Sequence, residues 1–178
     1  MKFLPILLLV SFGFTSRAQT TSLTVTMAGI GDIKVGMTKA EVEKLTGQSI
    51  KLVELLKKSD DWKRDTINLT HKNVVYQLIF DKDYINEKPK GFIVYEVKSK
   101  TAELKTKSGI SIGDDKLKIV STYGDYMMQI QPDYENDYTT KSKTRSTVWL
   151  YGDNNTVIIF YLDSNKITGF SVMYSEGC

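Results

Sequence analysis

The sequence predicts an α+β fold built from two tandem repeats, each a short helix or helix-loop-helix followed by a three-stranded antiparallel meander, packed as one unit. One observation is that residues 33–47 align without a gap with residues 110–124. Another is that the spacing of apolar residues changes after each segment from a helical period to the alternation of a strand. A chain of 178 residues has room for one compact unit or two small ones.

Each aligned segment carries the start and stop signals of a helix. In the first, Thr38 is the expected N-cap, Glu41 completes a capping box, and Gly47 suits the left-handed position after a helix. In the second, Asp115 is the expected cap and Gly124 the stop. The apolar residues that we expect to face a sheet are Ala40, Val42, Leu45, Leu117, Ile119 and Val120.

Six strands are expected from the alternating pattern, at residues 66–70, 74–80, 92–98, 147–151, 157–162 and 169–174. Turn-forming residues separate them, as at 152–155 and 163–165. A three-stranded sheet with one short helix is marginally stable alone, so the two copies should share a core or a continuous sheet. Residues 50–58 have a roughly helical apolar spacing that favours a second helix, although a strand also fits.

The start of the chain predicts export. Lys2, an apolar run over residues 3–14 and the small residues Ser16 and Ala18 are typical of a signal peptide, which we place at residues 1–18. We expect a periplasmic or secreted protein after cleavage near Ala18, with no transmembrane segment and no lipid anchor. The remaining divisions are an N-terminal lead at 19–28, repeat 1 at 29–100, a junction at 101–108 and repeat 2 at 109–178.

Composition and motifs argue against several activities. The 24 basic and 21 acidic residues are too balanced for a nucleic-acid partner. His71 is the only imidazole and Cys178 the only thiol, so we expect no metal site of nitrogen and sulfur ligands, and no cofactor is expected. Cys178 is either an unpaired thiol or a bridge between chains. No catalytic site is predicted, because the remaining enzyme alternative, a carboxylate-based hydrolase, has no acid and base set apart by their spacing.

Residues 33–47 resemble the opening helix of the SmpA/OmlA domain, found in the BamE-type small envelope proteins, which share a fold with the beta-lactamase inhibitor protein family. The duplication across residues 33–174 is more similar to the tandem arrangement of the inhibitors. The resemblance implies a non-enzymatic protein that binds another protein, in the inhibitor case through the concave aromatic face of a sheet. The chain lacks both the anchoring cysteine of the BamE-type proteins and the disulfides of the inhibitors.

One expected strand carries an aromatic face of its own. Side chains alternate along a strand, so Val148 and Leu150 should point to one face, and Trp149 and Tyr151 to the other. Trp and Tyr are enriched in binding hot spots. Three tyrosines of the preceding loop extend the patch in this prediction: Tyr126, Tyr134 and Tyr138.

The sequence leaves the use of these aromatics open. We expect partner binding, to a protein of the cell envelope or outside the cell. A small-ligand or glycan-binding carrier that stacks its ligand on the same rings is the alternative. A purely structural role also fits, in which Trp149 and Tyr151 cover a two-sided sheet or lie beneath the loop at 127–143.

Overall fold

The computed structural model describes residues 23–53, 64–85, 88–135 and 138–175. The predicted signal peptide and its cleavage site lie outside the described residues, as do residues 54–58 of the segment 50–58. Residues 50–53 are not helical, and Ile50 and Leu52 are buried in irregular chain.

The described residues are mostly β, with 55% in strands and 12% in two helices. The elements are β1 (Thr24–Thr26), β2 (Gly29–Ile30), β3 (Ile33–Lys34), α1 (Lys39–Thr46), β4 (Asp65–His71), β5 (Val74–Ile85), β6 (Lys88–Ser99), β7 (Lys105–Thr106), α2 (Lys116–Tyr123), β8 (Met128–Tyr134), β9 (Lys141–Tyr151), β10 (Thr156–Asp163) and β11 (Lys166–Tyr174).

The predicted α+β fold of two helix-plus-three-strand repeats is wrong. Strands from both halves of the chain join one seven-stranded antiparallel sheet, in the order β4-β5-β6-β11-β10-β9-β8. The second half contributes four strands to it instead of three. A separate four-stranded sheet, in the order β3-β2-β1-β7, also draws on residues assigned to the lead and the junction. The protein is therefore β-rich because strands far apart in the sequence pair with one another. The local pattern of apolar residues does not report such pairing.

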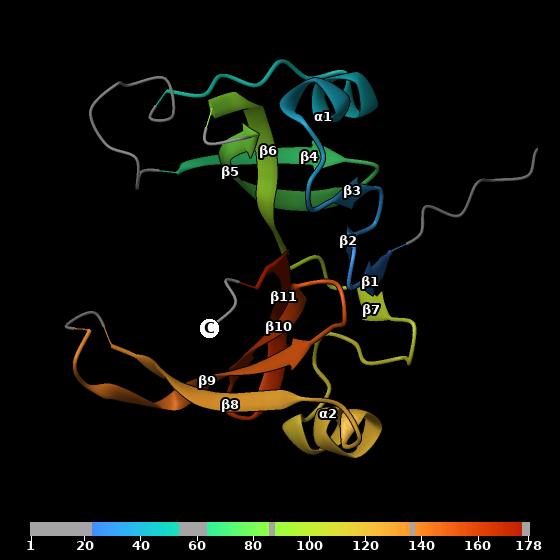
Figure 1. Cartoon of the computed structure of the whole chain (residues 1–178). Helices are drawn as coiled ribbons and strands as arrows, with labels where there is room; N and C mark the ends of the chain where they lie inside the picture. The colour runs from blue at the N-terminus through green and yellow to red at the C-terminus, as the bar shows by residue number, and fades with distance from the viewer. Residues whose placement is uncertain (1–22, 54–63, 86–87, 136–137, 176–178) are drawn as a thin grey trace, which may run out of the picture.

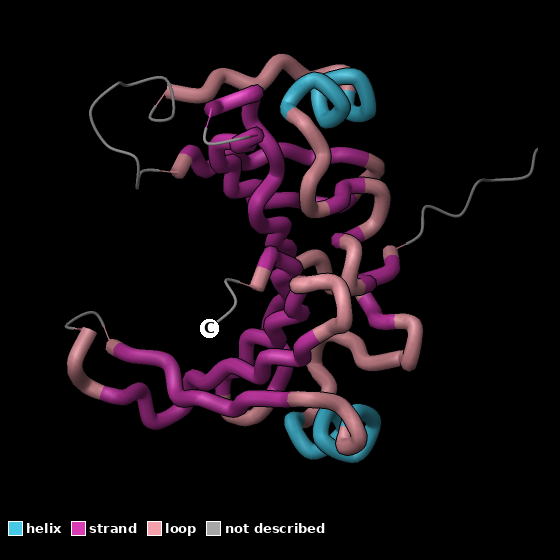
Figure 2. Tube along the Cα trace, in the orientation of Figure 1, coloured by secondary structure: helices cyan, strands magenta, loops and turns pink. Residues whose placement is uncertain are grey.

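The large sheet curves into a C (Figure 1). Both helices and the four-stranded sheet lie on its convex side, and the β4–β5 and β8–β9 hairpins form the two ends of the C (Figure 2). The two halves meet where β6 pairs with β11, with Val97 opposite Val172. Both valines are fully buried.

The core lies on the convex side of the large sheet. Phe160 of β10 packs against Phe170 of β11 at 5.6 Å between ring centroids, and against Tyr123 of α2 at 6.2 Å. Residues of the small sheet and its flanks complete the same buried cluster, among them Val25, Ile30, Ile33, Leu104 and Ile110. The small sheet therefore closes the side of the large sheet that two short helices leave uncovered.

Helix α1 begins as the sequence predicts. The Glu41 N–H donates to Thr38 Oγ1 at 3.2 Å and the Thr38 N–H donates to Glu41 Oε2 at 2.7 Å, which completes the capping box. Gly47 follows the helix with φ 70°, and its N–H donates to the Glu43 carbonyl at 2.8 Å. Val42 is the buried residue of this helix, whereas Ala40 is exposed.

Helix α2 follows the prediction less closely. Asp115 caps it by accepting from the Leu117 N–H at 2.9 Å. Gly124 ends it in a right-handed conformation, with φ −57°. Leu117 is 72% exposed, so it does not face the sheet. The helix has two turns, and Ile119 and Tyr123 form its buried face.

The six expected strands are present as β4, β5, β6, β9, β10 and β11, each longer than predicted. Strand β8 was missed because Pro132 and the polar residues around it interrupt the alternating pattern. It lies at the edge of the sheet, where a proline is tolerated, and it pairs with β9, with Gln129 opposite Trp149.

An ion pair connects the small sheet with the large one. Asp32, in the turn between β2 and β3, accepts from Lys72 Nζ at 2.9 Å and lies 3.6 Å from His71 Nε2. His71 and Lys72 belong to the β4–β5 hairpin. The hydrogen bond from Lys72 is the main cause that holds the pKa of Asp32 below its ordinary value.

We expect Asp32→Asn to lower the free energy of unfolding at pH 7 by about 0.5 to 1 kcal/mol, because the pair is partly exposed. A carboxylate with a lowered pKa contributes stability above its unfolded pKa of about 3.9, and loses it as the pH falls through the folded value. The difference between the wild type and the variant should therefore shrink below about pH 4 in urea unfolding curves. Asp153→Asn, an exposed change in the turn between β9 and β10, serves as the control. A difference that persists at pH 2.5 would contradict this account.

Candidate functional site on the concave sheet face

The concave face is the side of the large sheet opposite the core. Trp149 pairs with Ile159, Ile159 with Ser171, and Ser171 with Lys98, so these side chains share one face across four neighbouring strands. Phe160, next to Ile159, points to the core instead. No described helix covers the concave face (Figure 1).

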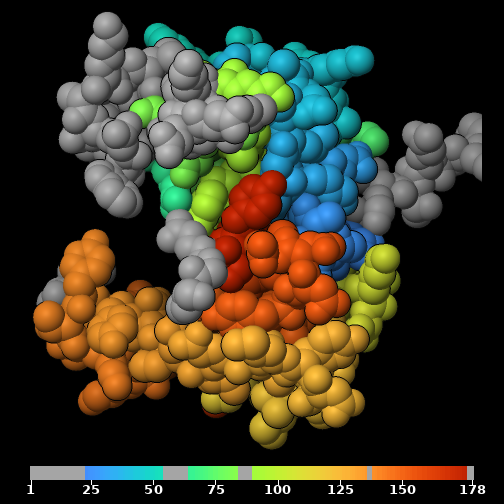
Figure 3. Space-filling model, viewed as in Figure 1, coloured from blue at the N-terminus to red at the C-terminus, as the bar shows by residue number. Residues whose placement is uncertain are grey.

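A cleft of about 880 Å³ lies on this face. Strands β4, β5 and β6 form one wall, β8 and β9 form the other, and β10 and β11 form the floor. Figure 3 shows the molecule hollowed between the β4–β6 half and the β8–β9 arm. The cleft therefore draws on both halves of the chain, and neither half alone could form it.

Four polar side chains cluster at the place where the halves meet. Ser171, fully buried, donates from Oγ to Glu96 Oε1 at 2.5 Å, and Lys98 Nζ lies 3.2 Å from the same oxygen. Lys98 Nζ also lies 5.7 Å from the ring centroid of Tyr161. Glu96 is only 6% exposed, so its carboxylate has little contact with water. The contacts with Ser171 and Lys98 replace those lost hydrogen bonds to water.

The cluster sets the charge at the floor of the cleft. Burial lowers the pKa of Lys98, but the attraction of Tyr161 and Glu96 outweighs it, and the pKa of Lys98 lies above that of an ordinary lysine. Burial and the nearby Glu96 raise the pKa of Tyr161, against the opposing effect of Lys98. At neutral pH the cleft therefore presents the Lys98 ammonium group from its β6 wall and the neutral Tyr161 phenol, a hydrogen-bond donor, from its floor.

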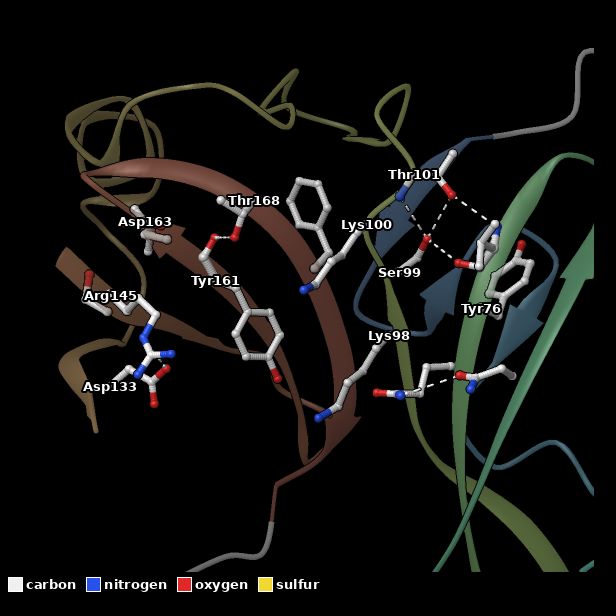
Figure 4. Close-up of a pocket in the computed structure, with 16 residues that line it drawn as sticks. Tyr76, Lys98, Ser99, Lys100, Thr101, Asp133, Arg145, Tyr161, Asp163 and Thr168 are labelled. Atoms are coloured by element: carbon white, nitrogen blue, oxygen red, sulfur yellow. Dashed lines mark hydrogen bonds and ion pairs between the residues drawn. The ribbon is translucent and has the colours of Figure 1, made fainter. Parts of the chain in front are cut away.

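The β8–β9 wall is held together by Arg145. Its guanidinium donates to the Tyr134 carbonyl at 2.7 Å and to Glu135 at 3.1 Å, and lies 3.5 Å from Asp133. Figure 4 shows Arg145 and Asp133 side by side at the edge of the cleft. The carboxylates of Asp133 and Glu135 thus neutralise the positive charge of this wall.

The structure brings two of the five predicted aromatics together. Trp149 and Tyr151 are half-buried on the concave face, beyond Thr147, which pairs with Tyr161. Trp149 Nε1 donates to Thr147 Oγ1 at 3.0 Å, and the Tyr151 hydroxyl donates to Gln129 Oε1 at 3.0 Å. Both rings are therefore oriented by hydrogen bonds within the same face.

The other three predicted tyrosines lie elsewhere. Tyr126 packs edge-on against Tyr123 of α2 at 5.8 Å, on the side of the helices. Tyr134 lies in β8 rather than in a loop, and is 44% exposed. Tyr138 lies in the turn between β8 and β9 with φ 57°, and is 87% exposed. These three do not extend the patch that Trp149 and Tyr151 form.

The sequence pattern does not single out Tyr161, Lys98 or Glu96. Alternation within β10 already separates Tyr161 from Phe160 and Leu162. However, the approach of Lys98 and Glu96 to Tyr161 depends on the pairing of β6 with β11, which no local pattern reports.

In the part of the chain that the structure describes, no three His, Cys, Asp or Glu side chains are grouped to hold a metal ion. No helix among these residues is long and apolar enough to cross a membrane. Comparison with protein-family models, curated proteins and solved structures gives no match to this chain. The resemblance to the SmpA/OmlA and inhibitor families therefore stays a prediction.

We expect Glu96→Gln to lower the free energy of unfolding by about 1 to 3 kcal/mol, because it leaves the half-buried Lys98 ammonium without a counter-charge. Urea unfolding of the Glu96→Gln and Lys98→Met single variants and of the double variant tests this. The double variant should recover part of the loss, since it removes the unpaired charge. Additive losses from the two substitutions would show that Glu96 and Lys98 are not coupled.

Proposed function

We propose that the protein is exported and acts by binding another protein, in the cell envelope or outside the cell, through the concave face of its large sheet. The pair Trp149 and Tyr151 carries this proposal, because both rings lie half-buried on a face that no described helix covers. Such rings contribute large contact areas at a small cost in conformational entropy. The resemblance to tandem inhibitors supports the same choice of surface.

The shape of the face favours a protruding element of the partner. The sheet curves around the cleft, so a loop or hairpin entering it would contact the walls and the floor together (Figures 1 and 3). Hot spots tend to lie near the centre of an interface, where water is excluded. The rings of Trp149, Tyr151 and Tyr161 are on the side of the sheet where such an element would enter.

A small ligand or a glycan is the second candidate. The cleft has the size of a small-molecule site, and amide and hydroxyl side chains line it together with Tyr161, including Asn68, Gln77 and Thr168. Amide groups and an aromatic ring in one cleft suit a sugar. The open shape of the cleft favours a protein instead.

The test is to replace both rings, in a Trp149→Ala, Tyr151→Ala double variant. The purified protein is used to capture partners from envelope and culture fractions, and the affinity of the captured protein is then measured in solution. We expect affinity to fall about 100-fold, because two hot-spot rings are lost. Tyr126→Ala, an exposed tyrosine on the helix side, is the matched control and should bind as the wild type does.

Unchanged partner affinity in the double variant would move the contact surface away from the concave face. Capture should be run with and without reductant, since a partner seen only without reductant would point to a disulfide through Cys178. If no protein is captured but tryptophan fluorescence changes on adding a sugar, the small-ligand candidate would be favoured.

A further inference from the structure

Two lysines on one wall of the cleft point toward the same space. Lys98 lies in β6, Lys100 directly follows Ser99, the last residue of that strand, and both line the cleft. Figure 4 shows their ammonium groups directed across β11 toward Tyr161. Both charges therefore lie on the β6 side of the cleft.

A glycine makes room for one of them. Gly169 of β11 is paired with Tyr161. A Cβ atom at Gly169 would lie only 3.0 Å from Lys100 Cγ, closer than carbon atoms normally approach. The absence of a side chain at Gly169 therefore lets the stem of Lys100 cross β11 toward the cleft.

The two lysines differ in how they are held. Lys98 is oriented by the buried Glu96 carboxylate, 3.2 Å from its Nζ, and by a hydrogen bond with Tyr161, so one of its three donors is left for a ligand. Lys100 is exposed, and no carboxylate among the described residues forms an ion pair with it. The cleft therefore contains the oriented ammonium group of Lys98 and the ammonium group of Lys100, which has no counter-charge among the described residues.

The acids of the cleft do not neutralise this pair. Figure 4 places Asp133 and Asp163 on the other side of Tyr161 from the two lysines. Asp133 lies 3.5 Å from Arg145, and Asp163 accepts from Ser164 Oγ at 3.1 Å. The β6 side of the cleft is therefore positively charged, and the Tyr161 hydroxyl adds a neutral donor to it.

We propose that Lys98, Lys100 and Tyr161 form a subsite for a carboxylate, supplied by an aspartate or glutamate on a protruding loop of the partner protein. This inference rests on the proposed function, since it names the group that the concave face recognises. Three donors converging on a partly enclosed space match the acceptors of one carboxylate. A loop can carry such a group to the floor of the cleft, where screening by solvent is weaker than at an open surface.

A library of disulfide-closed loops, each with eight randomised residues and displayed on phage, provides a defined probe. Selection against the purified protein should enrich loops with Asp or Glu at a recurrent position. Binding of these loops should weaken at least about tenfold with Lys100→Glu, and less with Lys100→Gln. Changing the recurrent acid to Lys should restore binding to Lys100→Glu, because the charges are then exchanged.

Lys44→Glu is the matched control, with the same change of charge on the exposed side of α1. It should leave binding of the selected loops unchanged. Thermal unfolding of each variant checks that the fold is kept, and Lys100 is exposed enough for substitution to be tolerated.

The outcomes separate this subsite from the proposed function. Selected loops that require Trp149 and Tyr151 but carry no recurrent acid, and that ignore Lys100→Glu, would overturn the subsite and leave the proposed function standing. Loops indifferent to all three residues would overturn both. Failure to select any loop, together with binding of galacturonate that Lys100→Glu abolishes, would overturn the protein source of the carboxylate.

Discussion

The rest of the structure depends on the pairing of β6 with β11. Four residue pairs, from Phe170 with Ser99 to Met173 with Glu96, join two hairpin systems into one sheet. On the convex face this seam buries Val97 and Val172 in the core. On the concave face it places Ser171 beside Glu96 and Lys98. A shift of one residue would exchange the two faces, so that charge would enter the core and valine would enter the cleft.

This seam also explains why the cleft has a polar floor in an otherwise apolar centre. A buried carboxylate is costly unless it is paired and hydrogen-bonded, and Glu96 obtains both from strands β6 and β11. The same contacts direct the Lys98 ammonium toward the open side. The side chains that stabilise the sheet at this seam therefore also form part of the proposed binding face. Trp149 and Tyr151 lie farther along the face, oriented by Thr147 and Gln129.

Much of the local structure could be predicted from the sequence. The capping box of α1 involves only Thr38 and Glu41, which are neighbours on one helical turn, so its signal is local. The strands around Trp149 were predicted because alternation reports which residues share a face. The small sheet was missed, because strands of two or three residues carry no period and gain their stability from partners far away in the chain. The resemblance implied a concave aromatic face, but only pairing identified Tyr161, Lys98 and Lys100 as neighbours in the cleft.

The sequence by itself therefore determined the two helices, six of the strands and the face on which Trp149 and Tyr151 lie, since each depends on residues close together in the chain. Only the tertiary structure decided that the two halves form one sheet, that the lead and the junction build a second sheet, and that a cleft opens on the concave side. The physical reason is that hydrogen bonds between strands are nearly the same for every residue. The choice of partner strand therefore follows from how the whole chain buries its apolar side chains.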